Sequence, residues 1–161
     1  MKKLRLFLAI LLAIVSASSM KATTYGPLLT AKWGTEAPFN GQCEFEYSGT
    51  TYQCQPGSTA IAASMVLYYW KYPTTTVGAL DSYSGDLTYG QTVPYVYPEL
   101  PATTFDWDNM KDEYTSYTEA AGVAVAELVR YAGRAQKMNY GVSGSSAKAD
   151  NVVDMLKKIR L

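Results

Sequence analysis

The segment CQPGSTAIAASMVLYYWKYP, residues 54 to 73, limits most strongly what this chain can fold into. Pro56 and Gly57 form a bend, and the run from Ser58 to Trp70 carries no charged residue. A helix that is apolar on every side is typical of a protein interior, so we predict a buried helix beginning at Ser58. The first turn of a helix carries the positive end of its dipole, which favours an anion or a nucleophile there. Ser58 is therefore the candidate catalytic residue.

The chain contains no histidine. Histidine is the commonest general base for activating a serine or cysteine nucleophile. Lys71 lies thirteen residues beyond Ser58 on the same predicted helix, which is about 20 Å at 1.5 Å per residue. The sequence therefore predicts a nucleophile-like position without a base to accept its proton.

The sequence around Ser58 resembles the streptopain family of secreted papain-like cysteine peptidases. Counting back from Trp70, Tyr72 and Pro73 places the family's nucleophilic cysteine at Ser58. Other stretches resemble the family in the same order, over roughly residues 25 to 160 of this chain. They are Pro27-Leu28-Leu29 with Trp33-Gly34, Pro38-Phe39-Asn40, Phe105-Asp106-Trp107-Asp108-Asn109-Met110, and the run from Ala124 to Ala147.

The resemblance implies an α+β fold of the papain-like type, consisting mainly of its helical half with long loops and few strands. We expect a signal peptide over residues 1–21 and a partial peptidase domain over residues 22–161. In the active family a cysteine thiolate attacks the scissile carbonyl, histidine moves the proton, and backbone N–H groups near the helix start hold the oxyanion. The family's histidine and a tryptophan-rich segment belong to a second half that is expected beyond Leu161.

By descent the expected activity is peptide-bond hydrolysis on a peptide or protein substrate, without a cofactor. We predict that this chain alone is inactive, because Ser58 replaces the cysteine and the histidine-bearing half is absent. A second polypeptide that supplies this half is an alternative, which would make the chain one piece of a split enzyme. Two further alternatives are a non-catalytic peptide- or protease-binding protein derived from the fold, and a truncated remnant.

The amino terminus predicts export from the cytoplasm. Lys2, Lys3 and Arg5 precede an apolar run from Leu6 to Val15 and then small residues, which is the pattern of a secretory signal peptide. The run is too short for a membrane span of about 20 residues, although a short membrane anchor is the alternative interpretation. We expect a secreted or periplasmic protein with no membrane association after signal cleavage.

The charge balance argues against a nucleic-acid partner. Removing Lys2, Lys3, Arg5 and Lys21 from 14 basic residues leaves 10, against 14 acidic residues. A nucleic-acid site needs clustered Lys and Arg, and the sequence has no basic stripe. We therefore expect no nucleic acid among the partners.

Cys43 and Cys54 bracket a short polar segment. In an oxidising compartment, a disulfide between them is the favoured expectation. The alternative makes Cys54 a displaced nucleophile, but it lies before Pro56 and also lacks an imidazole.

The other expected elements follow from hydrophobic spacing and turn residues. Residues 74 to 104 are rich in Tyr, Thr, Gly and Pro and predict a long loop with one hairpin. Helical spacing is found for Met110, Tyr114 and Tyr117, for Val125, Leu128, Val129 and Ala132 up to a stop at Gly133, and for Val152, Val153, Leu156 and Ile159 in a last helix from about Ala147. Helix faces meant for an absent sheet are expected to form an exposed apolar patch.

Two other groups of residues carry side chains or backbone suited to a metal or a phosphate. Asp106, Asp108, Asp112 and Glu113 offer oxygen ligands for a metal, but their spacing fits no calcium loop, so we interpret them as charges at a helix N-terminus. Gly141 to Ser146 is rich in glycine and serine but has no phosphate-loop signature, so we expect a capping turn. No metal site is predicted.

Overall fold

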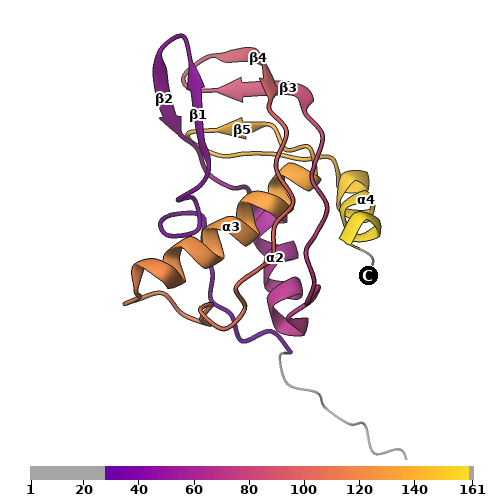
Figure 1. Cartoon of the computed structure of the whole chain (residues 1–161). Helices are drawn as coiled ribbons and strands as arrows, with labels where there is room; N and C mark the ends of the chain where they lie inside the picture. Colours follow the sequence, from indigo (N-terminus) through magenta and orange to yellow (C-terminus); the bar gives the residue numbers. More distant parts are fainter. Residues whose placement is uncertain (1–27, 160–161) are drawn as a thin grey trace, which may run out of the picture.

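The computed structural model describes residues 28–159, which form three helices and two small sheets (Figure 1). The elements are β1 (Glu44–Tyr47), β2 (Thr50–Gln53), α2 (Ser58–Trp70), β3 (Tyr83–Thr88), β4 (Thr92–Tyr97), α3 (Glu119–Ala135), β5 (Tyr140–Gly141) and α4 (Ala149–Ile159). This mixture of helices and short strands confirms the expected α+β class. The predicted signal peptide lies outside the described residues.

The first sheet is the antiparallel hairpin β1–β2, in which Phe45 lies opposite Tyr52. Ser48 and Gly49 link the strands with φ angles of 51° and 77°, and left-handed residues at both positions match the twist that a two-residue hairpin requires. The hairpin ends just before Gln55, so it leads directly into the bend that precedes α2.

The second sheet has the order β4-β3-β5, with β3 and β4 antiparallel and β5 parallel to β3. The β3–β4 hairpin confirms the one expected within residues 74 to 104. Pro94 lies in β4 at the edge of this sheet, where the missing N–H of proline is tolerated.

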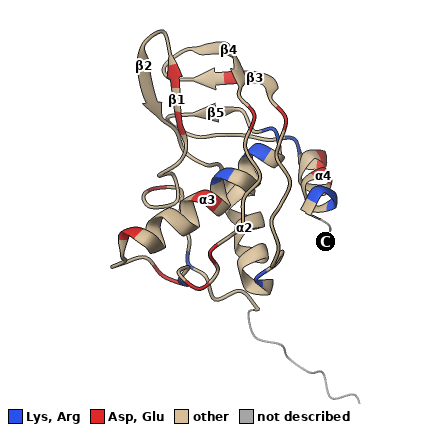
Figure 2. Ribbon diagram, viewed as in Figure 1, with Lys and Arg blue, Asp and Glu red and all other residues tan. Residues whose placement is uncertain are grey.

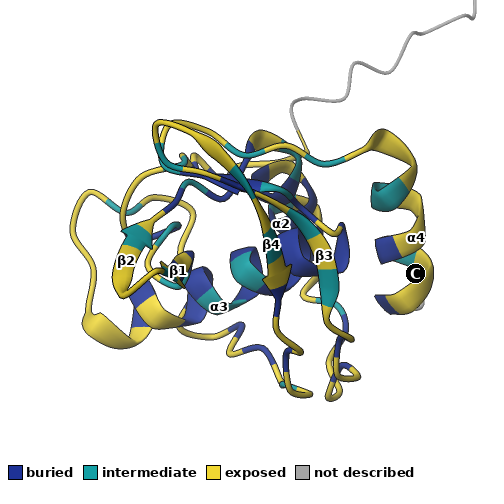
Figure 3. Cartoon of the chain, turned by 90° about the horizontal axis from the view of Figure 1, so that it is seen from above, coloured by how far each residue is buried: buried dark blue, intermediate teal, exposed yellow. Residues whose placement is uncertain are grey.

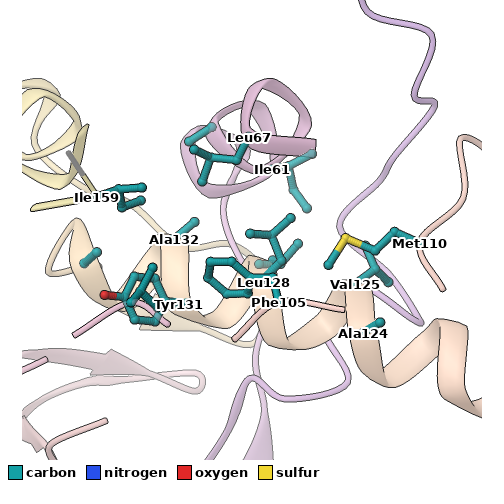
Figure 4. Packing of buried hydrophobic residues seen from close by; sticks show 14 of the residues in the cluster. Ile61, Leu67, Phe105, Met110, Ala124, Val125, Leu128, Tyr131, Ala132 and Ile159 are labelled. Atoms are coloured by element: carbon teal, nitrogen blue, oxygen red, sulfur yellow. The ribbon is translucent and has the colours of Figure 1, made fainter. Parts of the chain in front are cut away.

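The main core lies between α2 and α3 (Figure 4). Ile61 and Leu67 of α2 face Val125 and Leu128 of α3, and all four are buried. Aromatic side chains close the core around these helices, including Phe105, Trp107 and Tyr131. Apolar burial of this kind stabilises by about 25 cal/mol for each Å² removed from water, so the α2–α3 contact holds the candidate site in place.

A second cluster of buried side chains lies beneath the two sheets. Phe45, Tyr97 and Tyr140 form its aromatic centre, with ring centroids 4.6 to 5.5 Å apart. Ala60 in the first turn of α2 belongs to the same cluster. The first turn of α2 therefore packs against the residues beneath the sheets, and the rest of the helix packs against α3.

The expectation that α2 is buried on every side is wrong. Its buried residues lie on one side, and Val66, Tyr69 and Trp70 are 38%, 43% and 67% exposed. Figure 3 shows both exposed and buried residues in the helices. Within residues 28–159 no element covers this outer face of α2. The expected exposed apolar patch is therefore present, and it lies on α2.

The helix expected from Met110 to Tyr117 does not form. This stretch is irregular with bends at three residues, and α3 begins only at Glu119, after Thr118 accepts a hydrogen bond from the Ala121 N–H at 3.3 Å. The Asp106 carboxylate instead accepts a hydrogen bond from the side-chain amide of Asn109 at 2.7 Å, which closes a local turn. The interpretation of the acidic residues as charges at a helix start is therefore wrong.

The predicted stop at Gly133 is also wrong, because α3 continues to Ala135. A Cβ added at Gly133 would lie 2.4 Å from the Tyr140 hydroxyl and 3.5 Å from the Ala60 Cβ. Glycine is needed here for close packing rather than for ending the helix.

The last helix, α4, is present, with Met155 and Ile159 on its buried side. Val153 is 52% exposed, so its predicted place on the apolar face is wrong.

Candidate functional site

Ser58 is the first residue of α2, and its side chain is exposed. Gly57 precedes it with φ 75° and ψ 144°, and no side chain caps the helix. The Ile61 N–H donates to the Gly57 carbonyl at 3.2 Å, so the N–H groups of Ser58, Thr59 and Ala60 have no partner within the helix. The start of α2 thus presents an exposed hydroxyl beside backbone donors, at the positive end of the helix dipole.

The bend before Ser58 is held by the loop from Gly141 to Ser146. The Gln55 N–H donates to the Gly141 carbonyl at 3.0 Å, and the Ser145 hydroxyl donates to the Gln55 carbonyl. The Ser145 Oγ in turn accepts from the Gly141 N–H at 3.0 Å. The loop from Gly141 to Ser146 therefore braces the chain just before Ser58, a role that its composition did not reveal.

Gly57 could not be replaced without moving this loop. A Cβ at Gly57 would lie 2.7 Å from the Met138 Sδ and 3.0 Å from the Ser145 carbonyl oxygen. Its positive φ is also a conformation that side-chain-bearing residues rarely adopt. Glycine before Ser58 is therefore a geometric requirement of the site.

No general base is hydrogen-bonded to Ser58 among residues 28–159. The Ser58 hydroxyl has no hydrogen-bond partner among these residues, and the full sequence contains no histidine. Lys71 lies at the far end of α2, with its Nζ 3.7 Å from Asp108, which confirms the separation expected from helix geometry. A carboxylate near the bend belongs to Glu36, which accepts a hydrogen bond from the Gln55 side chain at 2.8 Å.

Polar groups lie buried beneath the first turns of α2. The Gln136 side chain is fully buried and donates to the Thr59 carbonyl at 3.4 Å. The hydroxyls of Thr59 and Ser64 are buried without a hydrogen-bond partner in the described part of the chain. Gln136 was not singled out from the sequence, because a lone glutamine at the end of a helix carries no pattern.

The two cysteines do not form the disulfide that the sequence favours, because both thiols are free and fully buried. Cys54 donates its N–H to the Cys43 carbonyl at 2.8 Å, so the two residues extend the β1–β2 pairing. Burial raises the pKa of the Cys43 thiol to about 12 and that of Cys54 to about 11. Because the thiolate is the reactive form, this environment keeps both as inert core thiols and argues against Cys54 as a nucleophile.

The acidic residues do not form a metal site. No group of three or more His, Cys, Asp or Glu side chains able to hold a metal occurs between residues 28 and 159. Asp108 pairs with Lys71 and Glu113 pairs with Lys32 at the surface. In the same part of the chain, no helix is long and apolar enough to cross a membrane.

The sequence and the fold are those of a peptidase family. The family model for the peptidase C10 family, the streptopain family, matches residues 33–160. The chain therefore belongs to the peptidase C10 family, which confirms the resemblance seen in the sequence.

Two solved structures show the same fold. Active wild-type interpain A, a cysteine protease from Prevotella intermedia, is 32% identical with a TM-score of 0.64, and the match covers 81% of this chain and 52% of that one. A prointerpain A fragment from the same organism is 29% identical with a TM-score of 0.62, covering 92% and 49%. The chain thus spans about half the length of these relatives, while no curated protein matches it.

Proposed function

We propose that this chain is the helical half of a C10 peptidase domain, with Ser58 at the nucleophile position, and that it does not cleave peptides by itself. The observation that carries the proposal is the open start of α2, where an exposed Ser58 hydroxyl lies without a base among the described residues. A serine hydroxyl stays protonated near neutral pH and needs such a base to attack an amide. Helix-terminal N–H groups remain available for an oxyanion, but they cannot remove the proton.

The first experiment compares the purified chain with Ser58→Cys and Ser58→Ala on fluorescent casein. All three proteins are expected to leave casein intact, because a thiol at this position still has no histidine to act with. The same three proteins are treated with a peptidyl inhibitor that reacts with active-site thiols, and labelling is read by mass spectrometry. Ser58→Ala measures the background from Cys43 and Cys54. Casein digestion by the chain or by Ser58→Cys, or inhibitor labelling of residue 58, would show that the proposal is wrong.

A histidine-bearing half is proposed to dock on the exposed face of α2. Supporting this, Val66, Tyr69 and Trp70 form an apolar stripe on the same helix that begins at Ser58, and solved relatives are about twice as long as this chain. The half could come from a continuation of the chain or from a second polypeptide. Sequencing past the codon for Leu161 and through the neighbouring genes tests this. A histidine with a tryptophan-rich segment is expected there, and its absence would refute the split-enzyme interpretation.

A non-catalytic peptide-binding role is the second candidate, and the same stripe favours it, because aromatic side chains supply contact area with little loss of entropy. Thermal unfolding with apolar peptides distinguishes this candidate from a truncated remnant. A cooperative transition that shifts upward with peptide, and that loses the shift in Val66→Ser/Trp70→Ser, supports binding. A broad transition without a shift supports a remnant instead.

Export to a secreted or periplasmic location is also proposed, on the basis of the amino-terminal signal pattern. Expression of the full chain with its own amino terminus, followed by fractionation and amino-terminal sequencing, tests it. We expect a product beginning near Ala22 outside the cytoplasm. A cytoplasmic product that retains Met1 would refute the proposal.

A further inference from the structure

A groove with a volume of about 640 Å³ lies beside β3, away from α2. Its walls include Ser84 and Gly85 from β3, Asn139 and Ser146 from the loop around β5, and the two lysines Lys137 and Lys148. Figure 2 shows basic residues along the segment that leads into α4 and on α4 itself. No residue of α2 lines this groove, although Ser146 of its lining follows Ser145, which braces the bend before Ser58.

Strand β3 borders the groove, and the backbone N–H and C=O groups of β3 that point away from β4 lie on the groove side. In an antiparallel pair, residues alternate between positions that exchange hydrogen bonds with the partner strand and positions that point outward. Asp86 lies opposite Pro94, which has no N–H to donate, and the Asp86 N–H bonds instead to the Asn139 side chain at 3.1 Å. Asp86 is therefore an outward position, and so is Ser84, two residues earlier.

The other neighbour of β3 does not reach Ser84. β5 pairs only with Leu87 and Thr88, because the chain turns away before Tyr140. The Asn139 side chain covers the next outward position, at Asp86. Within residues 28–159 the N–H and C=O of Ser84 therefore have no ladder partner, and they face the groove. An open strand edge of this kind is a template for pairing with another extended chain.

The groove is also positively charged. Lys137 and Lys148 line it without a carboxylate among the lining residues, and neither takes part in an ion pair within the described part of the chain. A smaller hollow of about 290 Å³ shares Lys137 and Asn151 and adds Lys157 and Lys158. The one carboxylate there, Asp154, lies 3.4 Å from the Lys157 Nζ. The lining therefore leaves unpaired positive charge beside a free strand edge.

We propose that this groove binds an extended acidic peptide, which adds a short strand beside Ser84 and places carboxylates against Lys137 and Lys148. Backbone hydrogen bonds supply affinity in strand addition, and side-chain contacts supply specificity. Successive residues of a strand point to opposite faces, so acidic residues at alternate positions present their carboxylates on one side. The inference goes beyond the function proposed above and does not depend on it.

The test measures binding of a fluorescein-labelled hexapeptide with glutamate at alternate positions, by fluorescence anisotropy with the full chain. The same peptide with glutamine, and a peptide N-methylated on alternate backbone amides, are the ligand controls. Binding of the acidic peptide is expected to weaken about fivefold for the N-methylated form, since one backbone hydrogen bond contributes about 1 kcal/mol. It is also expected to weaken with added salt, because exposed charge pairs are screened.

Protein variants separate this site from general charge attraction. Lys137→Ala/Lys148→Ala is expected to weaken binding about fivefold, at roughly 0.5 kcal/mol for each of two exposed ion pairs. Lys32→Ala/Lys111→Ala removes the same net charge from residues outside the groove and is expected to leave affinity unchanged. Ser84→Pro removes the outward N–H at a position of β3 that β5 does not reach, where proline is tolerated as it is in edge strands, and it is expected to weaken binding of the acidic peptide.

Circular dichroism of each variant checks that it is folded, and the N-methylated peptide tests the backbone contact even if Ser84→Pro does not fold. Equal binding by both double-lysine variants would overturn the proposal. Equal affinity for the glutamine peptide, or no saturable binding at millimolar peptide, would overturn it as well.

Discussion

Gly133→Ala is expected to destabilise the protein, although alanine is the better helix former. In the interior of α3 the substitution gains about 0.5 to 1 kcal/mol from backbone entropy. The added Cβ, however, would lie 2.4 Å from the Tyr140 hydroxyl, and Tyr140 is 1% exposed and packed between other rings. Overpacking of this kind costs about 1 to 3 kcal/mol, so the net loss in unfolding free energy is up to about 2.5 kcal/mol.

The partner substitution is Tyr140→Phe, which removes the atom in conflict. The Tyr140 hydroxyl is buried without a hydrogen-bond partner among the described residues, so its loss alone is expected to cost little. The backbone hydrogen bond from the Tyr140 N–H to the Tyr97 hydroxyl, 2.9 Å long, remains in this variant. In Gly133→Ala/Tyr140→Phe the alanine fits, and most of the lost stability is expected to return.

Urea unfolding followed by circular dichroism gives the free energies for this double-mutant cycle. Gly122→Ala is the matched control in the same helix, because its Cβ would contact the Tyr117 ring at 3.0 Å, and Tyr117 is 42% exposed, whereas Tyr140 is buried. The control is expected to be neutral or slightly stabilising. If Gly133→Ala were as stable as the parent, or if Tyr140→Phe failed to restore stability, the packing argument would be wrong.

Two other predictions concern buried thiols and the exposed face of α2. Because burial raises the pKa of Cys43 to about 12 and of Cys54 to about 11, folding favours the neutral thiols. Their contribution to stability is therefore complete below the ordinary thiol pKa of about 9 and is lost as the pH rises through 11 and 12. Between pH 8 and pH 11 the melting temperature of Cys43→Ala/Cys54→Ala is expected to fall less steeply with pH than that of the parent protein. An equal slope would contradict this. Tyr69→Ser/Trp70→Ser is expected to change the unfolding free energy by less than about 0.5 kcal/mol. It is also expected to reduce self-association measured by sedimentation velocity. Unchanged association would show that the protein does not self-associate through the apolar stripe on α2.

Local patterns in the sequence predicted the helices that pack on one another. The spacing of Val125, Leu128 and Val129 predicts α3, and the uncharged run after Gly57 predicts the start of α2, because both patterns depend only on neighbouring residues. The same spacing failed for Met110, Tyr114 and Tyr117. There the Tyr114 ring packs edge-on against Phe39 at 5.2 Å, and its hydroxyl accepts the Lys111 N–H. Contacts with a distant segment therefore outweigh local helical periodicity.

The candidate site illustrates the same limit. Gly57 and Ser58 could be identified from the sequence, because a glycine before an uncharged helix predicts a bend followed by an exposed helix start. The bracing contact from Ser145 to Gln55 joins residues ninety positions apart, and no periodic pattern encodes such a pair. The outer face of α2 is a related case, because an apolar helix surface predicts burial without identifying its partner. Val66 and Trp70 are exposed because no element of the described structure covers them. The composition of a helix therefore predicts that its apolar face is buried, but it does not identify the segment that buries it.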